Sequence, residues 1–354
     1  MRSAADGLEG EASGGANHNQ GDRSRAEVDL DDLVQRLSQL EGLLGKRDIQ
    51  LPASFFAHQP FPSLGAAADL GDDAALVPAA PGPLLLACEG LHPQLVAEDP
   101  WFAGWSGVLV NLSDIAAMGG RPLALVNSLW SVGEPAAAPL LAGMRFACDT
   151  FAIPMVGGHT NSQSPYTALA VSVLGVAEGP VLSARSARAG DALVLLLDGN
   201  GGFHRHYPFW DAATGADPRR LRMQLALLPQ LARAGIAHAA KDISMGGLVG
   251  TAAMFSEACG LGIAIEREAV ERPAGVDELR WLSCFPSFGF LLAVPPQRLG
   301  EVQRMLAPCG DLISGRIGSF SERQSGVWLV DGQGHEQIWD AAAPLTGFEA
   351  TRAP

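Results

Sequence analysis

Residues 107–125 read GVLVNLSDIAAMGGRPLAL and form the most informative stretch of the chain. The apolar run ends at Gly119 and Gly120 and a strand-like segment follows, so the pattern predicts a helix, a turn and a strand. Asp114 stands inside that helix between apolar residues. A carboxylate in such a place is costly to desolvate unless it is paired or bound to a metal ion. The stretch therefore indicates a functional carboxylate on a buried helix.

Strands and helices alternate around this stretch in two successive runs, which meet near residues 179–190. The two runs predict two α+β domains of ~150 residues each, a usual domain size. We place the N-terminal domain at 28–178 and the C-terminal domain at 179–340. The polar, Gly-rich residues 1–27 contain no apolar segment of the secretory kind and are expected to form a disordered tail, with a second tail at 341–354.

The composition argues against several classes of protein. The 354 residues carry a formal net charge of −14, which disfavours a nucleic-acid surface because phosphate backbones bind clustered Lys and Arg. No apolar run approaches the ~20 residues that span a bilayer, so no membrane association is expected. The five cysteines are scattered without a CxxC pair, as in a protein with reduced thiols. We therefore expect a globular cytoplasmic protein.

Common phosphate-binding and hydrolase motifs are missing from the sequence. There is no GxxxxGK[ST] loop, no complete GxGxxG after a strand, no GxSxG elbow and no HExxH pair. A P-loop, a dinucleotide fold, a serine hydrolase and a zinc protease are therefore unsupported. Phosphate chemistry would have to use metal ions and backbone amides.

Three further stretches place a carboxylate beside glycine or at the end of an element: GDDAALV (71–77), LLLACEGLH (84–92) and KDISMGGLVGT (241–251). Each signal is weak when taken alone. Asp72 and Asp73 are either turn residues or metal ligands, because Gly-Asp pairs favour turns for local reasons. Asp242 precedes a glycine-rich helix start, where N-capping is an equal alternative to metal binding.

Taken in order, these stretches resemble one superfamily. GDDAALV, GVLVNLSDIAAMGGRPLAL, VGGHT, RAGDALVL and KDISMGGLVGTAAMFSEACGLG follow one another. This order is similar to that of aminoimidazole ribonucleotide (AIR) synthetase, thiamine-monophosphate kinase, selenophosphate synthetase and the carbamoyl-dehydrating hydrogenase maturation protein. The resemblance runs from about residue 46 to residue 330. The first half is most similar to thiamine-monophosphate kinase.

The resemblance implies a two-domain, PurM-like α+β fold. The N-terminal halves of two chains would pair into a barrel-like sheet across a homodimer, with ATP in the cleft there, and the C-terminal half would be an α/β sandwich. Mg²⁺ ions, with Mn²⁺ as an alternative, would bridge aspartate carboxylates to the phosphates, and a small molecule would be the substrate. Such transfer depends on positioning and charge neutralisation rather than on a covalent protein nucleophile.

The resemblance also assigns roles to individual residues. The implied metal ligands are Asp72, Asp73, Glu89, Asp114 and Asp242. The implied nucleotide contacts are the backbone of Gly157 and Gly158, where a missing Cβ lets phosphate approach, together with Thr160 and Ser244. The implied catalytic residues are Lys46 and His159. Lys46 has a simpler alternative interpretation, a solvated lysine after a helix.

Three positions depart from the thiamine-monophosphate kinase pattern. Glu89 and Met245 each replace an aspartate, and His159 replaces the aspartate of a Gly-Gly-Asp-Thr motif. For His159, three interpretations stay open: a lost metal site, a preference for Mn²⁺ or Zn²⁺, which imidazole suits better than Mg²⁺, or an acid–base role. These departures argue against the thiamine-monophosphate kinase reaction itself.

The stretch LDGNGGFHRHYPFWDAATGADP (197–218) is unlike the kinase pattern. His204 and His206 would point the same way on a strand, but two ligands are too few for a metal site, so a polar loop with aromatic anchors is preferred. Sites often lie in loops, and this one is rich in aromatic, His and Asp residues. We therefore expect Trp210 and Asp211 to shape a substrate pocket.

Three functions are compatible with the sequence. The main hypothesis is ATP- and divalent-metal-dependent phosphoryl transfer to a small molecule, by a kinase or an ATP-activating synthetase. The alternative is a nucleotide-binding but catalytically silent accessory protein of a partner enzyme, which the replacements at 159 and 245 would suit. A metal-dependent hydrolase that uses the same carboxylates is the third.

Overall fold

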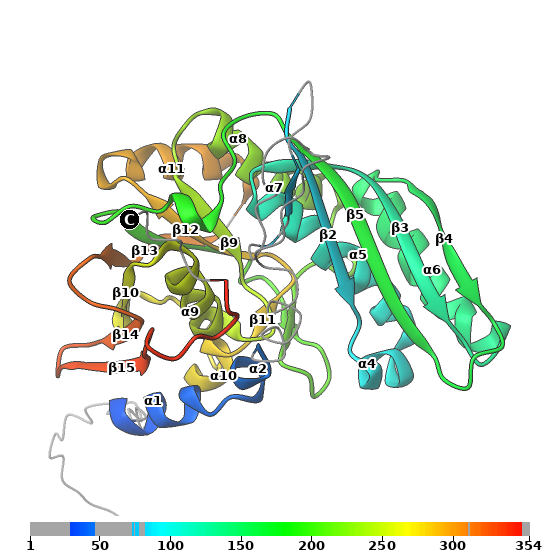
Figure 1. Cartoon of the computed structure of the whole chain (residues 1–354), viewed down its shortest axis with the longest axis horizontal. Coiled ribbons are helices and arrows are strands. Elements are labelled where there is room, and N and C mark those ends of the chain that lie inside the picture. Colours follow the sequence, from blue (N-terminus) through cyan, green and yellow to red (C-terminus); the bar gives the residue numbers. More distant parts are fainter. Residues whose placement is uncertain (1–28, 47–72, 74, 78–81, 311, 349–354) are drawn as a thin grey trace, which may run out of the picture.

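The computed structural model describes residues 29–46, 73, 75–77, 82–310 and 312–348. The chain folds into two mixed α+β halves that lie next to each other, as the sequence predicts (Figure 1). Among the described residues, none of the helices combines the length and the hydrophobicity that a membrane span requires.

In its described part, the first half is a five-stranded sheet with helices on one face (Figure 1). The strand order is β1-β2-β5-β3-β4, and all neighbours are antiparallel except β3 and β4. The elements are β1 (Ala75–Val77), β2 (Leu84–Gly90), α4 (Pro93–Glu98), α5 (Pro100–Ala117), β3 (Gly120–Trp130), α6 (Glu134–Phe151), β4 (Met155–Asn161) and β5 (Ala168–Ala177).

Burial alternates along this sheet because its two faces have different neighbours. Leu85 and Ala87 of β2 are buried in the core that α5 and α6 share with the sheet. On the other face, Leu86 is 50% exposed and Leu174, its cross-strand partner on β5, is 36% exposed. Val126 of β3 is also exposed. The described residues therefore leave this face of the sheet uncovered.

The second half is built on a seven-stranded mixed sheet in the order β15-β14-β10-β13-β6-β12-β9. Its strands are β6 (Ala192–Leu197), β9 (Ala239–Asp242), β10 (Gly262–Glu266), β12 (Gly289–Val294), β13 (Ile313–Ser321), β14 (Val327–Val330) and β15 (His335–Trp339). Its helices are α7 (Pro218–Leu225), α8 (Leu227–Arg233), α9 (Gly247–Cys259), α10 (Glu278–Leu282) and α11 (Leu299–Leu306).

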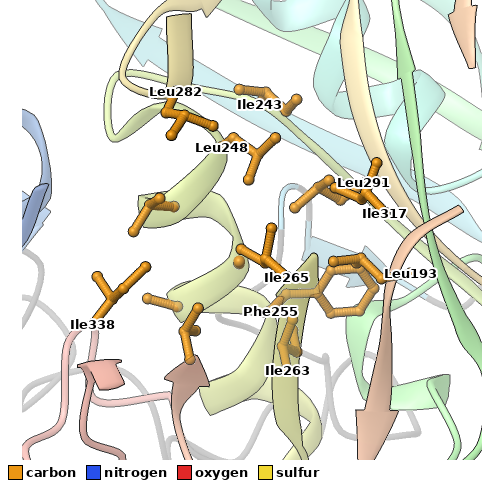
Figure 2. Packing of buried hydrophobic residues seen from close by; sticks show 14 of the residues in the cluster. Leu193, Ile243, Leu248, Phe255, Ile263, Ile265, Leu282, Leu291, Ile317 and Ile338 are labelled. Carbon is orange, nitrogen blue, oxygen red and sulfur yellow. The ribbon is translucent and has the colours of Figure 1, made fainter. Parts of the chain in front are cut away.

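Strand β6, with the sequence ALVLLL, is buried along its whole length. Leu193 and Leu195 pack into the core on the α9 side, whereas Val194 and Leu196 pack into the core that contains α8 and α11. Figure 2 shows the α9 side, with Phe255 of α9 beside Leu193. A continuous apolar run is what a strand covered on both faces requires. The second half is therefore a sheet between two helical layers, as expected.

The N-terminal helices pack against the second half. They are two separate helices, α1 (Leu30–Ser38) and α2 (Glu41–Leu44), because the backbone of Leu40 is extended. Helix α1 contacts β15, and α2 lies against α9, where a Cβ on Gly42 would come within 2.1 Å of the Met245 carbonyl oxygen. The break thus turns α2 onto the start of α9, and only glycine fits that approach.

A small sheet joins the two halves, in the order β11-β8-β7. Its strands are β7 (Gly202–Phe203), β8 (Phe209–Asp211) and β11 (Phe285–Pro286). His204 and His206 do not lie on a strand but in a loop, the interpretation that the sequence favoured. They occupy the turn between β7 and β8, where Arg205 has a left-handed backbone with φ of +52° that breaks the strand alternation.

Candidate active site

Helix α5 carries Asp114 into the centre of the molecule. Its N-terminus is capped by Asp99, whose Oδ1 accepts a hydrogen bond from the backbone N–H of Phe102 at 3.3 Å, and Pro100 fits the first turn. Most of the helix is buried because it contacts the first sheet, α6 and β9 of the second half. It ends before Gly119, which has a φ of +72°. Asp114 consequently lies against the end of β9.

Three carboxylates from both halves converge in one cavity. Asp73 precedes β1, Asp114 lies on α5 and Asp242 ends β9, yet one oxygen from each carboxylate lies within 4.8 Å of the other two. Asp114 is 6% exposed and Asp242 is 5% exposed. The cavity has a volume of about 200 Å³, and we call it the acidic cavity. Its lining also includes Lys46, Glu89, Lys241, Ser244, Met245 and Phe285.

The acidic cavity suits a divalent cation with oxygen ligands. Mg²⁺ prefers oxygen ligands, and one oxygen from each of the three carboxylates lies within 4.8 Å of the other two. Asp114 Oδ2 is buried and has no hydrogen-bond partner among the described residues. A buried carboxylate oxygen without a partner is costly, and a cation would remove that cost. Asp73, Asp114 and Asp242 therefore fit a metal site.

Lys241 supplies a positive charge of the protein itself to this cavity. Its side chain is 5% exposed and donates a hydrogen bond to Asp73 Oδ1. The backbone N–H of Asp242 donates to the other oxygen of Asp73 at 3.4 Å. A buried ammonium needs such a partner because an isolated charge is expensive to desolvate. Lys241 was not among the residues predicted from the sequence, where its only signal is its place directly before a predicted metal ligand.

Glu89 and Lys46 lie at the edge of the same cavity. The period of β2 puts Glu89 on the face of Leu85 and Ala87, towards α5. Lys46 Nζ donates a hydrogen bond to Ser244 Oγ at 3.2 Å. The structure therefore brings Lys46, Glu89 and Ser244 together with the three aspartates. Asp72 lies outside the described residues.

The crowding of charges shifts the pKa values in the cavity. Burial, with the charges of Asp242 and Glu89, raises the pKa of Asp114 well above its usual range. Burial also raises the pKa of Asp242, against the effect of Lys241. Burial and the charge of Asp242 raise the pKa of Glu89 to about 7, although its side chain keeps contact with solvent. Burial lowers the pKa of Lys46. A divalent cation would favour the ionised carboxylates.

Both halves of the chain match the domains of one family. Residues 71–177 match the N-terminal domain of AIR synthase related protein, and residues 188–330 match its C-terminal domain. An uncharacterised protein of Synechocystis is 44% identical over 321 residues, which are 90% of this chain and 98% of that protein. The chain belongs to the AIR synthase related protein family.

Proteins with a named activity are more distant from this AIR synthase-related protein. Thiamine-monophosphate kinase of Halobacterium salinarum is 26% identical over 277 residues, covering 74% of this chain and 92% of the kinase. The solved structure of AaThiL complexed with AMPPCP and TMP has a TM-score of 0.58 at 22% identity, covering 76% and 90% of the two chains. T. maritima PurL complexed with ATP has a TM-score of 0.63 at 15% identity, covering 82% of this chain and 47% of PurL. At these identities the two structures establish the fold alone.

The GGHT segment of the AIR synthase-related protein lies apart from the acidic cavity within one chain. Gly157, Gly158, His159 and Thr160 are exposed on β4. Strand β4 forms the opposite edge of the sheet from β1, with β5 and β3 between it and β2. Three spacings of ~4.8 Å separate β4 from β2 by about 14 Å. The predicted nucleotide and catalytic roles of these residues stay predictions.

Gly158 has a structural reason to be glycine. Its φ is +150°, and a Cβ there would lie 2.5 Å from the carbonyl oxygen of Asn127 on β3. The pairing of β3 with β4 thus requires glycine at this position whether or not phosphate binds. At Gly157 a Cβ would meet nothing closer than 3.8 Å, so the structure places no such demand on it.

Proposed function

We propose that the protein catalyses ATP- and divalent-metal-dependent transfer of a phosphoryl group to a small molecule, as a kinase or as an ATP-activating synthetase. The convergence of Asp73, Asp114 and Asp242 from both halves carries the proposal. Family membership supports it, because similar proteins include a thiamine-monophosphate kinase and a PurL complexed with ATP.

In the proposed reaction, the three aspartates hold Mg²⁺, or Mn²⁺ as the alternative. A bound ion would supply charge neutralisation for the phosphates. Lys241 holds Asp73 in place through their ion pair. Lys46, beside Ser244 at the edge of the cavity, binds a phosphate oxygen through its ammonium. A covalent intermediate on the protein is not required.

Isothermal titration calorimetry of ATP with and without Mg²⁺ tests this proposal. Wild-type protein should bind ATP in a Mg²⁺-dependent manner, and Asp114→Asn should weaken that binding by at least ~10-fold because the negative charge of a metal ligand is lost. The control is Asp149→Asn, which changes an exposed carboxylate on α6 that forms an ion pair with Arg145. It should bind as wild type does. Wild-type protein that binds no ATP under either condition would refute the proposal.

A nucleotide-binding accessory protein without turnover is the second candidate. Met245 lines the acidic cavity where an aspartate stands in the kinase pattern, and Lys241 takes up one side of Asp73. The cavity thus offers fewer carboxylates than that pattern. ATP binding without loss of the γ-phosphate across a broad metabolite panel would favour this candidate, and ADP formation with any acceptor would exclude it.

We further propose a homodimer in which the open faces of two first-half sheets meet. Leu86, Val126 and Leu174 form an apolar surface on that face, and such surfaces often mark protein contacts. Pairing there would offer the exposed GGHT segment of each chain to its partner. Leu174→Asp should shift the mass measured by light scattering from dimer to monomer, whereas Leu141→Asp, 44% exposed on α6 in the wild type, should not. A monomeric wild type at micromolar concentration would contradict the dimer.

A further inference from the structure

A second cavity adjoins the acidic cavity. Its volume is about 360 Å³, and it shares Glu89, Val110, Met245 and Phe285 with the acidic cavity. We call it the apolar pocket. Its size falls in the range of small-molecule sites. Because the two hollows share a wall, a molecule in the apolar pocket can present one end to the carboxylates.

Both halves of the chain supply the walls of the apolar pocket. One face of α5 contributes Phe102, Trp105 and Leu109, which are spaced by three and four residues. Strands β8 and β11 contribute Phe209, Trp210, Phe285 and Pro286 from the opposite side. Flat aromatic walls of this kind favour a ring-shaped ligand between them.

Trp210 is held in one orientation in this wall. Its Nε1 donates a hydrogen bond to the backbone oxygen of Asp198 at 3.1 Å. Its ring meets the ring of Trp281 edge-on, with centroids 5.0 Å apart, and that of Phe203 with centroids 5.2 Å apart. The wall is therefore preformed rather than assembled by the ligand.

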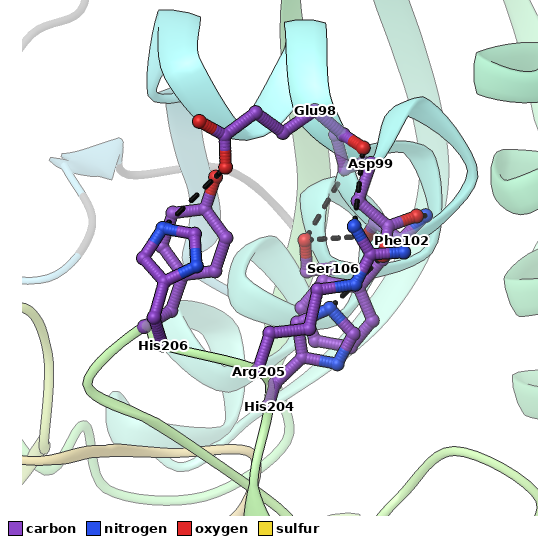
Figure 3. Close-up of polar contacts among 9 residues, drawn as sticks. Glu98, Asp99, Phe102, Ser106, His204, Arg205 and His206 are labelled. Atoms are coloured by element: carbon purple, nitrogen blue, oxygen red, sulfur yellow. Dashed lines mark hydrogen bonds and ion pairs between the residues drawn. The ribbon is translucent and has the colours of Figure 1, made fainter.

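The turn between β7 and β8 holds the two sides of the pocket together (Figure 3). His204 Nε2 lies 3.0 Å from Asp99 Oδ2, and the His204 ring stacks on Phe102 with centroids 3.7 Å apart. Tyr207 donates a hydrogen bond from its hydroxyl to Glu98 Oε2 at 2.6 Å. These contacts fix the second half to the start of α5, which itself forms the facing wall.

The polar groups of the apolar pocket disfavour an anion. Among the described residues that line it, none is Lys or Arg, and its ionisable side chains are the carboxylates of Glu89 and Asp211 and the imidazole of His92. Asp211 Oδ1 accepts hydrogen bonds from the backbone N–H groups of Ala213 and Thr214. The hydroxyl of Ser106 donates to the backbone oxygen of Phe102 at 2.7 Å, so its lone pairs face outward as acceptors. A ligand with hydroxyl or N–H donors complements this set, whereas an anion would face two carboxylates and no Lys or Arg.

We propose that the apolar pocket binds the phosphoryl acceptor, and that this acceptor is a ring compound whose body carries hydrogen-bond donors and no negative charge. The inference deepens the proposed function and rests on it for the role of acceptor. The reacting hydroxyl lies at the Glu89 end, next to the acidic cavity. It forms the new bond to the γ-phosphorus, the bond from phosphorus to the ADP oxygen breaks, ADP keeps that electron pair, and the hydroxyl proton passes to solvent.

Two probes with the same ring and different charge test the specificity. Benzyl alcohol and benzoate should be titrated into the full-length protein with Mg²⁺ and ATP present, and followed by ligand-observed NMR. We expect benzyl alcohol to bind at least about tenfold more tightly than benzoate, and to bind together with ATP rather than in competition with it. Benzoate that binds as tightly as benzyl alcohol would overturn the proposal.

A substitution that fills the apolar pocket tests the same proposal. Ser106→Phe should weaken benzyl alcohol binding at least tenfold and leave Mg²⁺-dependent ATP binding unchanged, whereas Ser325→Phe on an exposed turn should change neither. If Ser106→Phe does not fold, Leu109→Ala enlarges the same pocket and should favour 2-naphthalenemethanol over benzyl alcohol. An unchanged ratio of the two affinities in Leu109→Ala would contradict the assignment.

The outcomes separate this inference from the proposed function. Displacement of benzyl alcohol by ATP, with ATP binding lost in Ser106→Phe, would assign the pocket to the nucleobase and overturn the inference. ATP binding without any binding of benzyl alcohol would also overturn it but leave the proposed function standing. Benzyl alcohol binding without any ATP binding would refute the proposed function and support the ring specificity of the pocket.

Discussion

The acidic cavity and the apolar pocket share four residues but have opposite chemistry. The acidic cavity gathers three aspartates and two lysines in about 200 Å³, whereas aromatic and aliphatic side chains dominate the 360 Å³ of the apolar pocket. The shared boundary of Glu89, Val110, Met245 and Phe285 separates the three aspartates and the two lysines from the aromatic walls of the apolar pocket. Under the proposed function, the acidic cavity would neutralise the phosphates and the apolar pocket would shield the body of the acceptor from water.

Removing the charge of Lys241 in the acidic cavity is expected to cause the largest loss of stability. Lys241→Met leaves the buried carboxylate of Asp73 without its ion-pair partner, so the free energy of unfolding should fall by about 3–5 kcal/mol. The matched control is Arg316→Met, which breaks an exposed pair with Glu266 and should cost less than about 1 kcal/mol. Urea denaturation of the metal-free proteins measures both, and equal losses would show that burial does not set the difference.

A negative charge placed on the shared boundary should change ligand binding in both cavities. Met245→Asp adds a carboxylate to both linings, so Mn²⁺ should bind about tenfold more tightly and benzyl alcohol about tenfold more weakly. Calorimetry and ligand-observed NMR measure the two changes. Met223→Asp, on a side chain that is 44% exposed in the wild type, is the control and should alter neither. An effect on only one ligand would mean that the hollows are not continuous at Met245.

The carboxylates of the acidic cavity should also make the stability of the protein depend on pH. The pKa of Glu89 is raised from its ordinary value of 4.5 to about 7, so its stabilising protonation is fully present below pH 4.5 and is lost as pH rises towards 7. Asp114 and Asp242 act in the same direction. The free energy of unfolding of the metal-free protein should therefore fall across this window, and Glu89→Gln should flatten the fall.

Metal binding provides a second measurement of the same titration. Mg²⁺ binding at pH 7 should release on the order of one proton, because the ligands must ionise. Calorimetry in two buffers of different ionisation enthalpy measures the release, and Glu336→Gln, an exposed carboxylate on β15, is the control. The raised pKa of Glu89 would be contradicted if the free energy of unfolding of the wild type, relative to that of Glu89→Gln, rose between pH 4.5 and pH 7.

Removing the hydrogen bond between Tyr207 and Glu98, at the end of α4, should have the smallest effect on stability and binding. Tyr207→Phe removes the hydrogen bond to Glu98 but keeps the ring stacked on Phe209, with centroids 5.2 Å apart. The unfolding midpoint should fall by a few degrees at most, and benzyl alcohol binding should weaken slightly. Tyr166→Phe changes the other tyrosine of the chain, which is exposed, and should have no effect. A large loss of ATP binding in Tyr207→Phe would show that the two hollows are not independent.

Local patterns in the chain were sufficient for the two-part architecture and for Asp114 of the acidic cavity. The two α+β halves follow from the apolar periodicity within each segment. The unbroken apolar run of β6 indicates a strand that is buried on both faces. Asp114 stood out because a carboxylate inside an apolar helix needs a partner. The roles of Asp73, Glu89 and Asp242 were implied only by the family resemblance that the order of the motifs carries.

Other features exist only because distant surfaces meet. The Lys241–Asp73 pair joins residues 168 positions apart, and no local pattern says which carboxylate a lysine will reach. The break at Leu40 depends on the fit of Gly42 against Met245, and the walls of the apolar pocket come from α5, β8 and β11. Such contacts depend on how separate elements pack, and packing is a property of the assembled tertiary structure rather than of any one segment.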